Sequence, residues 1–460
     1  MRNTLVIVGA GFSGTVLAAN LLRRPPATPT DIVLAERGSA IGRGVAYASH
    51  EFPYLLNVPA ARLSADSRDA LQFLRFARTR LAAADGEDFL PRALYGDYLQ
   101  DLLLQAERAA PPHIKLVRLF GEVTGIKQCD GAKPLAAQFA QREPIPADFV
   151  VLALGVAPPR PPAWAARVAD HRAFRHDPRD LPDGLASKHS VVIVGNGLTM
   201  VDAASILSRD AGRIPTLHTI SRRGLLPLPQ TAFRAGATQG GRESLLASAH
   251  SLKQLLKAGR ALAREVEACG GDWREAVTSI RKLAPRLWRQ LPAAEQRRFV
   301  RHLQAHWDVH RHRLPPQLAE RIEHLRRSGR LQVNAGRIQN VIAADGRLRV
   351  SWRPRGSGES QQLLVDLVVN ATGPNCGIDD SADALVNSLR SAGLVSADAL
   401  RLGIRTARYG ACLNAQDIAS NHLFYLGPML RADHWEATAA LELRDHAEHL
   451  ATHLREQLGS

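Results

Sequence analysis

The sequence has few cysteines and no long apolar run. Its four cysteines, Cys129, Cys269, Cys376 and Cys412, are scattered over 460 residues and form no Cys-x-x-Cys pair. This pattern argues against a zinc site, a disulfide framework and a dithiol reductase. No apolar run approaches the ~20 residues that cross a bilayer. We therefore expect a cytoplasmic protein that holds no metal and has no membrane anchor.

Acidic residues are also scarce relative to basic ones. The chain has 59 Lys and Arg against 44 Asp and Glu, which gives a formal net charge of +15. The arginines are spread along the chain, without a charged tail or a nucleic-acid-binding motif. We therefore expect no nucleic acid partner and interpret the charge as background composition. A weaker alternative is a positive field that attracts an anionic cofactor and an acidic substrate.

The sequence does contain a dinucleotide-binding pattern at its start. Leu5–Val8 is a short apolar run typical of a buried parallel strand, and it leads into Gly9-x-Gly11-x-x-Gly14. In this pattern the first glycine permits a tight turn, the second admits a pyrophosphate, and the third lets a helix pack closely on the strand. The amides at the start of that helix then face the phosphates.

The residues that follow complete a βαβ unit. Thr15–Leu22 is the expected helix, and Asp31–Ala35 is the expected second strand. Glu36 ends that strand, where a carboxylate can bind both hydroxyls of an adenosine ribose. The pattern fits FAD or NAD, and its position at the start of the chain favours FAD. The alternative is a glycine-rich turn that binds no ligand.

A second pattern begins at Ser190–Val194, an apolar run followed by Gly195-Asn196-Gly197. Met200 stands where the third glycine would be, and we expect it to move the helix slightly away from the strand. The next strand, Thr216–Ser221, leads into Arg222-Arg223, where the first pattern has its acidic residue. Arginine at this point can bind a ribose 2′-phosphate, so this site is predicted to take NADPH. Two exposed arginines beside an NADH site are the alternative.

Several segments between the two patterns have a recognisable periodicity. Helices are expected over Leu71–Leu81 and Tyr95–Ala106, and loops over Gly42–Tyr47 and Leu55–Ala60. Strands are predicted over Ile114–Phe120, Glu122–Ile126 and Phe149–Leu154, and the first two alternate like an antiparallel pair.

In the rest of the chain, the hydrophobic pattern first becomes helical. Glu243–Gln304 has leucines at helical spacing and predicts a helical insertion. Trp307–Pro316 is expected to close it as a loop, in which His310 and His312 lack the partners of a metal site. The remaining strands are predicted at Leu331–Asn334, Ile338–Ala343, Leu348–Trp352, Leu363–Val369 and Leu423–Leu426, and a last helix over Glu436–Gln457.

Together these elements predict an α/β protein with two Rossmann-like dinucleotide-binding domains. The FAD-binding domain is expected at residues 1–160 and 374–460, and the NADPH-binding domain at residues 186–241 and 329–373. Residues 242–328 are the predicted helical insertion of the NADPH domain. The proline-rich stretch at residues 157–162 is expected to be the linker that leaves the first domain.

Several longer motifs span nearly the whole chain, namely Gly42–Tyr47, Leu55–Ala60, Gly197–Asp202, Ser221–Pro227, Arg311–Pro316 and Gly427–Arg444. Jointly they resemble a bacterial FAD/NAD(P)-binding family related to the amine N-hydroxylating (class B) flavin monooxygenases. The stretch Asp366–Gly373 is similar to a stretch of those enzymes that reads Asp-x-x-x, then an aromatic residue or Leu, then Ala-Thr-Gly. It departs from that pattern at Asn370, and the next residue, Pro374, stands where those enzymes usually have tyrosine.

The resemblance implies the two-dinucleotide-binding flavoprotein fold and an FAD- and NADPH-dependent monooxygenase. Such an enzyme oxygenates the nitrogen of a small amine or amino acid through a C4a-hydroperoxyflavin formed with O2. Two alternatives stay open on the residues alone. One is an FAD-dependent NAD(P)H oxidoreductase that passes electrons to another acceptor without oxygenation, and the other is a non-catalytic nucleotide-binding protein. The oligomeric state is left open.

The site residues follow from these patterns and from the resemblance. Those predicted to bind FAD are Gly9, Gly11, Ser13, Gly14, Glu36, Arg37, Arg43, Asn57, Val123, Gly155 and Gly427. Those predicted to bind NADPH are Gly195, Gly197, Leu198, Thr199, Arg222, Arg223 and Gly373. The flavin carries the chemistry in this interpretation, and Asn57, Arg311 and Arg313 are the candidate substrate contacts.

Overall fold

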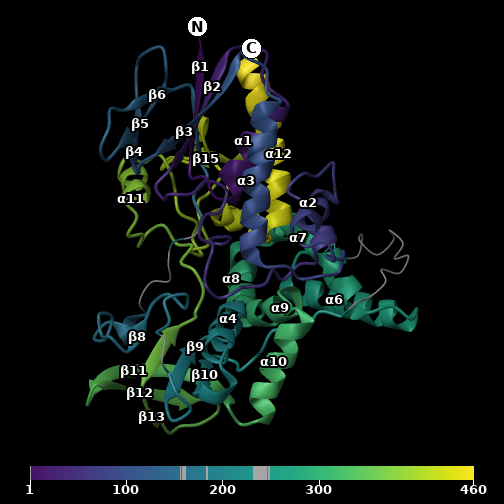
Figure 1. The fold of residues 1–460 in the computed structure, drawn as a ribbon, viewed down its shortest axis with the longest axis vertical. Coiled ribbons are helices and arrows are strands. Elements are labelled where there is room, and N and C mark those ends of the chain that lie inside the picture. Colours follow the sequence, from purple (N-terminus) through teal and green to yellow (C-terminus); the bar gives the residue numbers. More distant parts are fainter. Residues whose placement is uncertain are drawn as a thin grey trace. The chain divides into compact units, whose positions relative to one another are not determined.

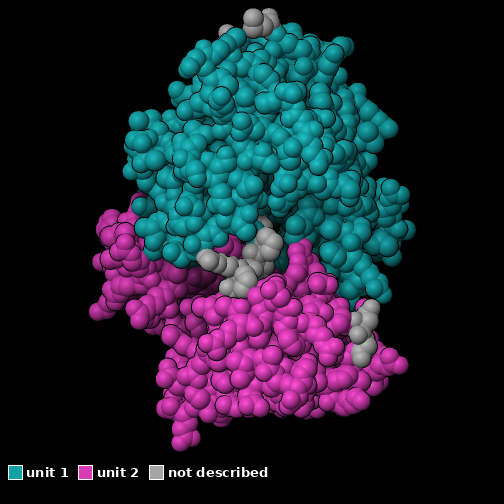
Figure 2. Space-filling view, turned by 90° about the vertical axis from the view of Figure 1, so that its left-hand side faces the viewer, with its two compact units in different colours: residues 1–157, 284–289, 376–460 teal, residues 158–283, 290–375 magenta. Residues whose placement is uncertain are grey.

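The computed structural model describes residues 2–155, 157, 162–182, 185–231, 246 and 249–459. The chain divides into two compact units, which Figure 2 colours separately. The first comprises Met1–Ala157, Ala284–Arg289 and Cys376–Ser460, and the second comprises Pro158–Leu283 and Gln290–Asn375. Within the described ranges, no helix combines the length and the apolar character needed to cross a membrane.

The first unit is built around a six-stranded sheet in the order β15-β16-β7-β1-β2-β3. Its strands are β1 (Asn3–Val8), β2 (Thr30–Glu36), β3 (Ile114–Phe120), β7 (Phe149–Leu152), β15 (Ala411–Leu413) and β16 (Ala419–Tyr425). All neighbours pair in parallel except β15, which runs antiparallel to β16. Strand β1 therefore lies between β7 and β2, where the strand order reverses. Open parallel sheets bind ligands at the carboxyl edge of this point.

Helices cover this sheet and complete its core. Helix α1 (Phe12–Arg23) follows β1 and packs against both α3 (Arg92–Arg108) and α12 (Ala440–Gly459), as Figure 1 shows. Their apolar faces and the central strands form one continuous buried cluster. The unit also contains α2 (Gln72–Arg80), α11 (Ala384–Ser391) and a small antiparallel sheet of β4 (Val123–Gln128), β5 (Leu135–Phe139) and β6 (Ile145–Ala147).

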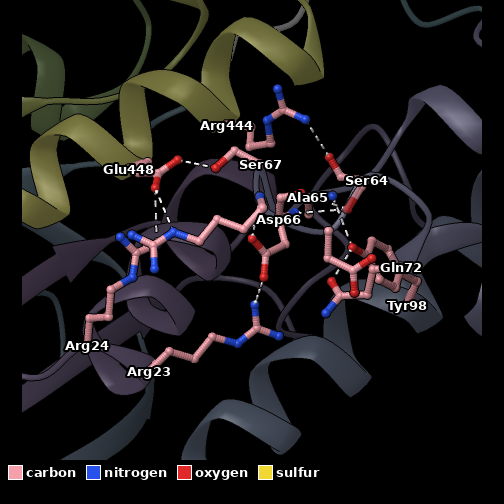
Figure 3. Close-up of polar contacts among 12 residues, drawn as sticks. Arg23, Arg24, Ser64, Ala65, Asp66, Ser67, Gln72, Tyr98, Arg444 and Glu448 are labelled. Atoms are coloured by element: carbon pink, nitrogen blue, oxygen red, sulfur yellow. Dashed lines mark hydrogen bonds and ion pairs between the residues drawn. The ribbon is translucent and has the colours of Figure 1, made fainter.

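A polar network binds the loop at residues 64–68 to α1 and α12 (Figure 3). Arg23 pairs with Asp66 at 2.7 Å, and Arg24 pairs with Glu448 at 3.1 Å. The Ser67 hydroxyl donates a hydrogen bond to the other oxygen of Glu448. That hydrogen bond, together with the nearby Arg24 guanidinium, lowers the pKa of the Glu448 carboxyl. The network therefore holds an ionised carboxylate at the surface of the first unit.

The second unit contains a seven-stranded sheet in the order β13-β12-β11-β10-β9-β14-β8. Its strands are β8 (Phe174–Arg175), β9 (Ser190–Val194), β10 (Thr216–Ser221), β11 (Leu331–Ala344), β12 (Arg347–Pro354), β13 (Gln361–Val365) and β14 (Leu367–Asn370). Strands β8, β14, β9, β10 and β11 pair in parallel, and β11 to β13 continue as antiparallel neighbours. Strand β9 thus lies between β14 and β10, as β1 lies between β7 and β2.

The helices of the second unit fall into two groups. Helices α4 (Leu198–Leu207) and α10 (Pro316–Arg327) pack on the core of the sheet. Between β10 and α10 lie α6 (Leu252–Ala268), α7 (Trp273–Gln290), α8 (Ala293–His302) and α9 (Gln304–Arg311). Helices α6 and α7 bury a separate apolar cluster. Pro285 lies inside α7, close to Ala284, where the helix passes from the second unit to the first.

The strands predicted from the sequence are present, but one pairing and two sets of strand boundaries were predicted wrongly. Strand β3 is parallel to β2 and does not pair with β4, because α3 carries the chain across the sheet before β3 begins. The two strands predicted over Leu331–Ala343 are one strand, β11. Its first half pairs with β10 and its second half with β12, and a bulge lies at Ile338–Asn340. The strand predicted over Leu363–Val369 divides at Asp366 into β13 and β14.

Two further predictions also differ from the structure. His310 lies in α9 and not in a loop, and its Nδ1 is 2.7 Å from the carbonyl oxygen of His306, one turn earlier. The last helix begins at Ala440, and the residues from Glu436 to Ala439 form turns before it. The centre of the predicted proline-rich linker and the start of the predicted insertion lie outside the described residues.

Candidate dinucleotide-binding sites

The first glycine turn, Gly9–Gly14, has a different space around each glycine. Gly9 has φ +103°, and a Cβ there would lie 2.5 Å from the carbonyl oxygen of Ala153. A Cβ on Gly14 would lie 1.9 Å from the carbonyl oxygen of Gly9. A Cβ on Gly11 would meet only the Cα of Gly44, at 3.6 Å. The first and third glycines are therefore required by packing, whereas the space at Gly11 is open enough for a phosphate.

The open side of this turn carries unpaired backbone donors. Gly11 is the N-cap of α1 and has no side chain to cap the helix. The first amides of a helix lack intrahelical partners, and they carry the positive end of its dipole. A second loop lies against the turn, because the Gly42 amide donates to the Ala10 carbonyl at 2.8 Å. Gly42 and Gly44 both have positive φ, +86° and +51°, a conformation that favours glycine.

Glu36 ends β2 beside the first glycine turn, where a ribose ligand is expected. One of its oxygens accepts from the Ala10 amide at 2.8 Å, and the other accepts from the Gly38 amide at 2.8 Å. These two bonds fix the orientation of the carboxylate. A carboxylate accepts about four hydrogen bonds, so the group retains capacity for two ribose hydroxyls.

The remaining backbone positions predicted for FAD gather at the same edge of the sheet. Gly155 follows β7, and Gly427 follows β16, so both lie at carboxyl ends of strands parallel to β1. A Cβ on Gly427 would lie 2.5 Å from the carbonyl oxygen of Leu154. Ser13 is buried in α1. Val123 is the first residue of β4, two residues after Gly121, whose amide donates a hydrogen bond to the Glu36 carbonyl.

The two arginines predicted for FAD are engaged within the first unit. Arg37 is exposed and pairs at 3.0 Å with Asp383 at the N-cap of α11. Arg43 pairs with Asp97 on α3, and it also donates to the Ser49 hydroxyl at 3.1 Å. Arg43 thereby anchors the loop that carries Gly42 and Gly44. Asn57 is half-buried and has no hydrogen bond to any other described residue.

The second glycine turn, Gly195–Met200, repeats the first in the second unit. Gly195 has φ +111°, and a Cβ there would lie 2.2 Å from the carbonyl oxygen of Ala371. Gly197 is the N-cap of α4, and a Cβ there would meet nothing within 4 Å. Met200, in place of a third glycine, is fully buried. Asn196 is only 6% exposed, and neither atom of its amide has a partner among the described residues.

The position equivalent to Glu36 is Ser221, which sequence reasoning missed. Val8 is opposite Ala35 in the first sheet, and Val194 is opposite Ile220 in the second. The next residues are therefore Glu36 and Ser221, and the predicted equivalence of Glu36 with Arg222-Arg223 is shifted by one. The Ser221 hydroxyl accepts from the Gly224 amide at 3.0 Å. The equivalence of Ser221 with Glu36 follows from the register of β10 against β9, which the sequence alone does not show.

Arg222 and Arg223 have different surroundings. Arg223 donates to the carbonyl of His302 at 2.8 Å, at the carboxyl end of α8. Arg222 is exposed and has no carboxylate partner among the described residues. Of the two guanidiniums, that of Arg222 is therefore the one available to an anion beside Ser221.

The other predicted NADPH and substrate residues are placed as follows. Leu198 and Thr199 form the first turn of α4, and Gly373 (φ +94°) follows β14 as Gly155 follows β7. Arg311 ends α9, and the Arg313 guanidinium lies 6.0 Å from the ring centre of Trp273. Both arginines already have interaction partners within the protein.

Part of the chain matches a known family model. Residues 6–157 match a family model described as FAD-NAD(P)-binding, which covers the first glycine turn, Glu36 and β7. No curated protein matches the chain.

Solved structures of the same fold match the chain along its whole length. They include L-lysine 6-monooxygenase from Pseudomonas syringae, with a TM-score of 0.67 at 15% identity, covering 100% of both chains. An ornithine N-hydroxylase from Kutzneria sp. 744, in complex with reduced FAD, NADP⁺ and L-ornithine, matches with a TM-score of 0.63 at 17% sequence identity. The match again covers 100% of both chains. Thioredoxin reductase from T. acidophilum reaches 0.52 at 11%, covering 100% of this chain and 99% of that one. The two-dinucleotide-binding flavoprotein fold predicted from the sequence is therefore confirmed.

Proposed function

We propose that this protein is an FAD- and NADPH-dependent monooxygenase that oxygenates the nitrogen of a small amine or amino acid. The observation that carries the proposal is the pair of equivalent glycine turns with different residues at the ribose position. Glu36 suits the free ribose hydroxyls of FAD, and Ser221 followed by Arg222 suits a ribose 2′-phosphate. A chain with one site of each kind can deliver hydride from NADPH to a flavin.

The residues of the two turns bind and orient the cofactors. The open N-termini of α1 and α4 suit pyrophosphates, and Glu36 suits the adenosine ribose of FAD. When bound, FAD accepts hydride from NADPH and activates O2. The unpartnered amide of Asn196 suits a polar ligand or a bound water at the second turn. We assign Arg222 and Ser221 to the 2′-phosphate and Arg223 to the support of α8.

The solved structures support the choice of an amine substrate and O2. Six of the solved structures that match are named as lysine, ornithine or cadaverine monooxygenases or hydroxylases, with TM-scores of 0.55–0.67, whereas a thioredoxin reductase and a bacillithiol disulfide reductase reach 0.52 and 0.54. A reductase acting on disulfides would need a pair of cysteines, and Cys129, Cys269, Cys376 and Cys412 are all free thiols. We therefore favour oxygenation over transfer of electrons to another acceptor.

The test is product analysis with isotopically labelled O2. The purified flavoprotein would be incubated with NADPH and a panel of L-ornithine, L-lysine, putrescine and cadaverine. We expect one labelled oxygen atom in a hydroxylamine product, with NADPH consumed in proportion. Steady NADPH oxidation that yields only hydrogen peroxide or a reduced added acceptor, with no labelled amine, would assign the protein to the reductases.

A further inference from the structure

Arg431 is a half-buried arginine without an acceptor. It lies in η5 (Pro428–Ala432), the short helix that follows Gly427. Among the described residues, its guanidinium makes no hydrogen bond and no ion pair, and its Nε is fully buried. Buried donors are nearly always satisfied in native proteins, so the buried Nε–H without a partner indicates that an anion completes the site.

The aromatic residues beneath Arg431 hold its guanidinium in place. The guanidinium carbon lies 4.0 Å from the ring centre of Trp435. Trp435 is buried and stacks on Trp288, with ring centres 4.6 Å apart. The Trp288 indole N–H donates to the Ala432 carbonyl at 2.9 Å, which ties this stack back to η5. A guanidinium stacked on a ring keeps its planar edge of donors free, and that edge matches a carboxylate in two parallel hydrogen bonds.

The one thiol close to Arg431 does not neutralise it. Burial raises the pKa of the Cys376 thiol, although the Arg431 charge opposes this shift. Cys376 is therefore uncharged at neutral pH. Because a neutral thiol is only a weak acceptor, Arg431 has no ion-pair partner in the part of the chain that the structure describes.

Arg431 also lies at the edge of the sheet where a flavin is expected. Strand β16 runs parallel to β7, which runs parallel to β1. The segments after these strands therefore emerge at one edge, which places η5 on the same edge as Gly155 and the first glycine turn. In open parallel sheets this edge is where ligands bind.

We propose that Arg431 is the anchor for the carboxylate of the substrate, which makes the substrate an amino acid with a second amine and not a simple diamine. This inference rests on the proposed function and deepens it. Arg431 takes precedence here over Arg311 and Arg313, because those two arginines belong to the second unit, whereas Arg431 follows β16 of the first sheet. An anchored carboxylate fixes one end of the molecule and so orients the distal amine.

The experiment compares each amino acid with its own decarboxylated amine. L-Ornithine and putrescine form one pair, and L-lysine and cadaverine form the other. In Arg431→Gln, we expect kcat/KM for the amino acids to fall at least about tenfold, because a hydrogen-bonded charge pair is lost. Turnover of the diamines should change less than about twofold. Arg431→Lys keeps the charge without the planar edge of donors. Its kcat/KM for the amino acids should therefore lie between that of the unchanged protein and that of Arg431→Gln.

Arg408→Gln is the matched control. Arg408 also stacks on an aromatic ring of the first unit, 4.6 Å from the ring centre of Tyr409, but it is exposed. We expect this variant to treat both members of each pair as the unchanged protein does. Equal losses for amino acid and diamine in Arg431→Gln, with altered flavin reduction in the absence of substrate, would assign Arg431 to the flavin and overturn the proposal. Unchanged kinetics would also overturn it.

A binding measurement separates this proposal from the proposed function. Trp435 lies directly under Arg431, so L-ornithine should change tryptophan emission in the unchanged protein and not in Arg431→Gln, while putrescine should change neither. This response without any oxygenated product would support the anchor and refute monooxygenation. The same emission change in both proteins would overturn the anchor, whatever the reaction catalysed.

Discussion

The two glycine turns share one backbone design and differ in the residues that choose the ligand. In both, the first glycine has a strongly positive φ and packs on a carbonyl oxygen, of Ala153 in one and Ala371 in the other. In both, the second glycine is an open helix N-cap. The shared residues thus build the same open helix N-terminus twice, and we propose that the difference between Glu36 and Ser221 sets which ribose fits.

The third position shows how the two turns tolerate different side chains. Gly14 has no room for a Cβ, whereas Met200 occupies the equivalent place and is fully buried. In α4 the Gly197 carbonyl accepts from the Met200 amide at 3.0 Å, three residues on, and from the Val201 amide at 3.3 Å, four residues on, whereas in α1 the Gly11 carbonyl accepts from the Thr15 amide at 3.1 Å. A locally tighter first turn accompanies the larger residue. Close helix–strand contact is therefore needed in the first site and is dispensable in the second.

The largest effect is expected from Gly14→Ala. The added Cβ would lie 1.9 Å from the Gly9 carbonyl oxygen, which rigid backbone cannot relieve. We expect destabilisation of ~3 kcal/mol or more, with loss of bound flavin. Urea unfolding followed by circular dichroism is the measurement, and Gly131→Ala, where a Cβ meets nothing within 4 Å, is the control. A Gly14→Ala protein as stable as the control would contradict the packing argument.

Valine at the second glycine should separate the two sites. Gly11→Val and Gly197→Val place their side chains in open space, so both proteins should fold. Because the space at each N-cap is the expected phosphate position, Gly11→Val should be colourless. Gly197→Val should keep its flavin and lose reduction by NADPH. Flavin absorbance and stopped-flow reduction measure the two effects, and full flavin occupancy in Gly11→Val would refute the assignment of the first site.

The ribose position should control the choice between NADPH and NADH. Charge-assisted contacts to a phosphate are worth roughly 1.5–3 kcal/mol, so Arg222→Ala should cost at least tenfold in reduction by NADPH. Ser221→Glu should favour NADH further, because a carboxylate repels the 2′-phosphate and binds free hydroxyls. Arg223→Ala should leave the preference nearly unchanged, since Arg223 supports α8. The ratio of reduction rates with the two nucleotides is decisive, and a larger shift in Arg223→Ala than in Arg222→Ala would reverse this assignment.

The smallest effect on stability is expected from a change at Glu448, which pairs with Arg24 just after the end of α1. Glu448→Gln removes the charge that binds Arg24 and weakens the bond from Ser67, which should cost ~1 kcal/mol at neutral pH. The pKa of Glu448 is lowered in the folded protein from its ordinary 4.5, so this stability is present above that value and is lost as the pH falls through the folded pKa.

The matched variant for this prediction is Glu323→Gln. Glu323 pairs with Arg326 and Arg327 on the exposed face of α10 in the second unit, and exposed pairs contribute little. Thermal unfolding at several pH values compares the two variants with the unchanged protein. A Glu448→Gln deficit that grows as the pH is lowered would contradict the assigned direction of the pKa shift.

Local patterns predicted the two glycine turns and the strands before them, and non-local pairing decided the rest of the fold. The glycines, the apolar runs of β1 and β9 and the ends of β10 are encoded within a few residues, and they were predicted correctly from them. The equivalence of Glu36 and Ser221 depends on strand register, which no short window contains. Likewise, β11 is one strand only because it has partners on two different strands. Arg431 stands out because its buried Nε has no acceptor among the described residues, and this depends on tertiary packing that the sequence does not show.

The division of the first unit between the two ends of the chain has a consequence for synthesis on the ribosome. Strand β16, which completes the sheet beside β7, and helix α12, which covers α1, both belong to residues 376–460. The second unit is translated before them, so its sheet can form while the first unit still exposes the edge of β7 and one side of α1. Domains fold as units, and exposed apolar surface and strand edges promote aggregation. Nascent chains that stall within the last segment should therefore depend on chaperones more than chains that have been fully released.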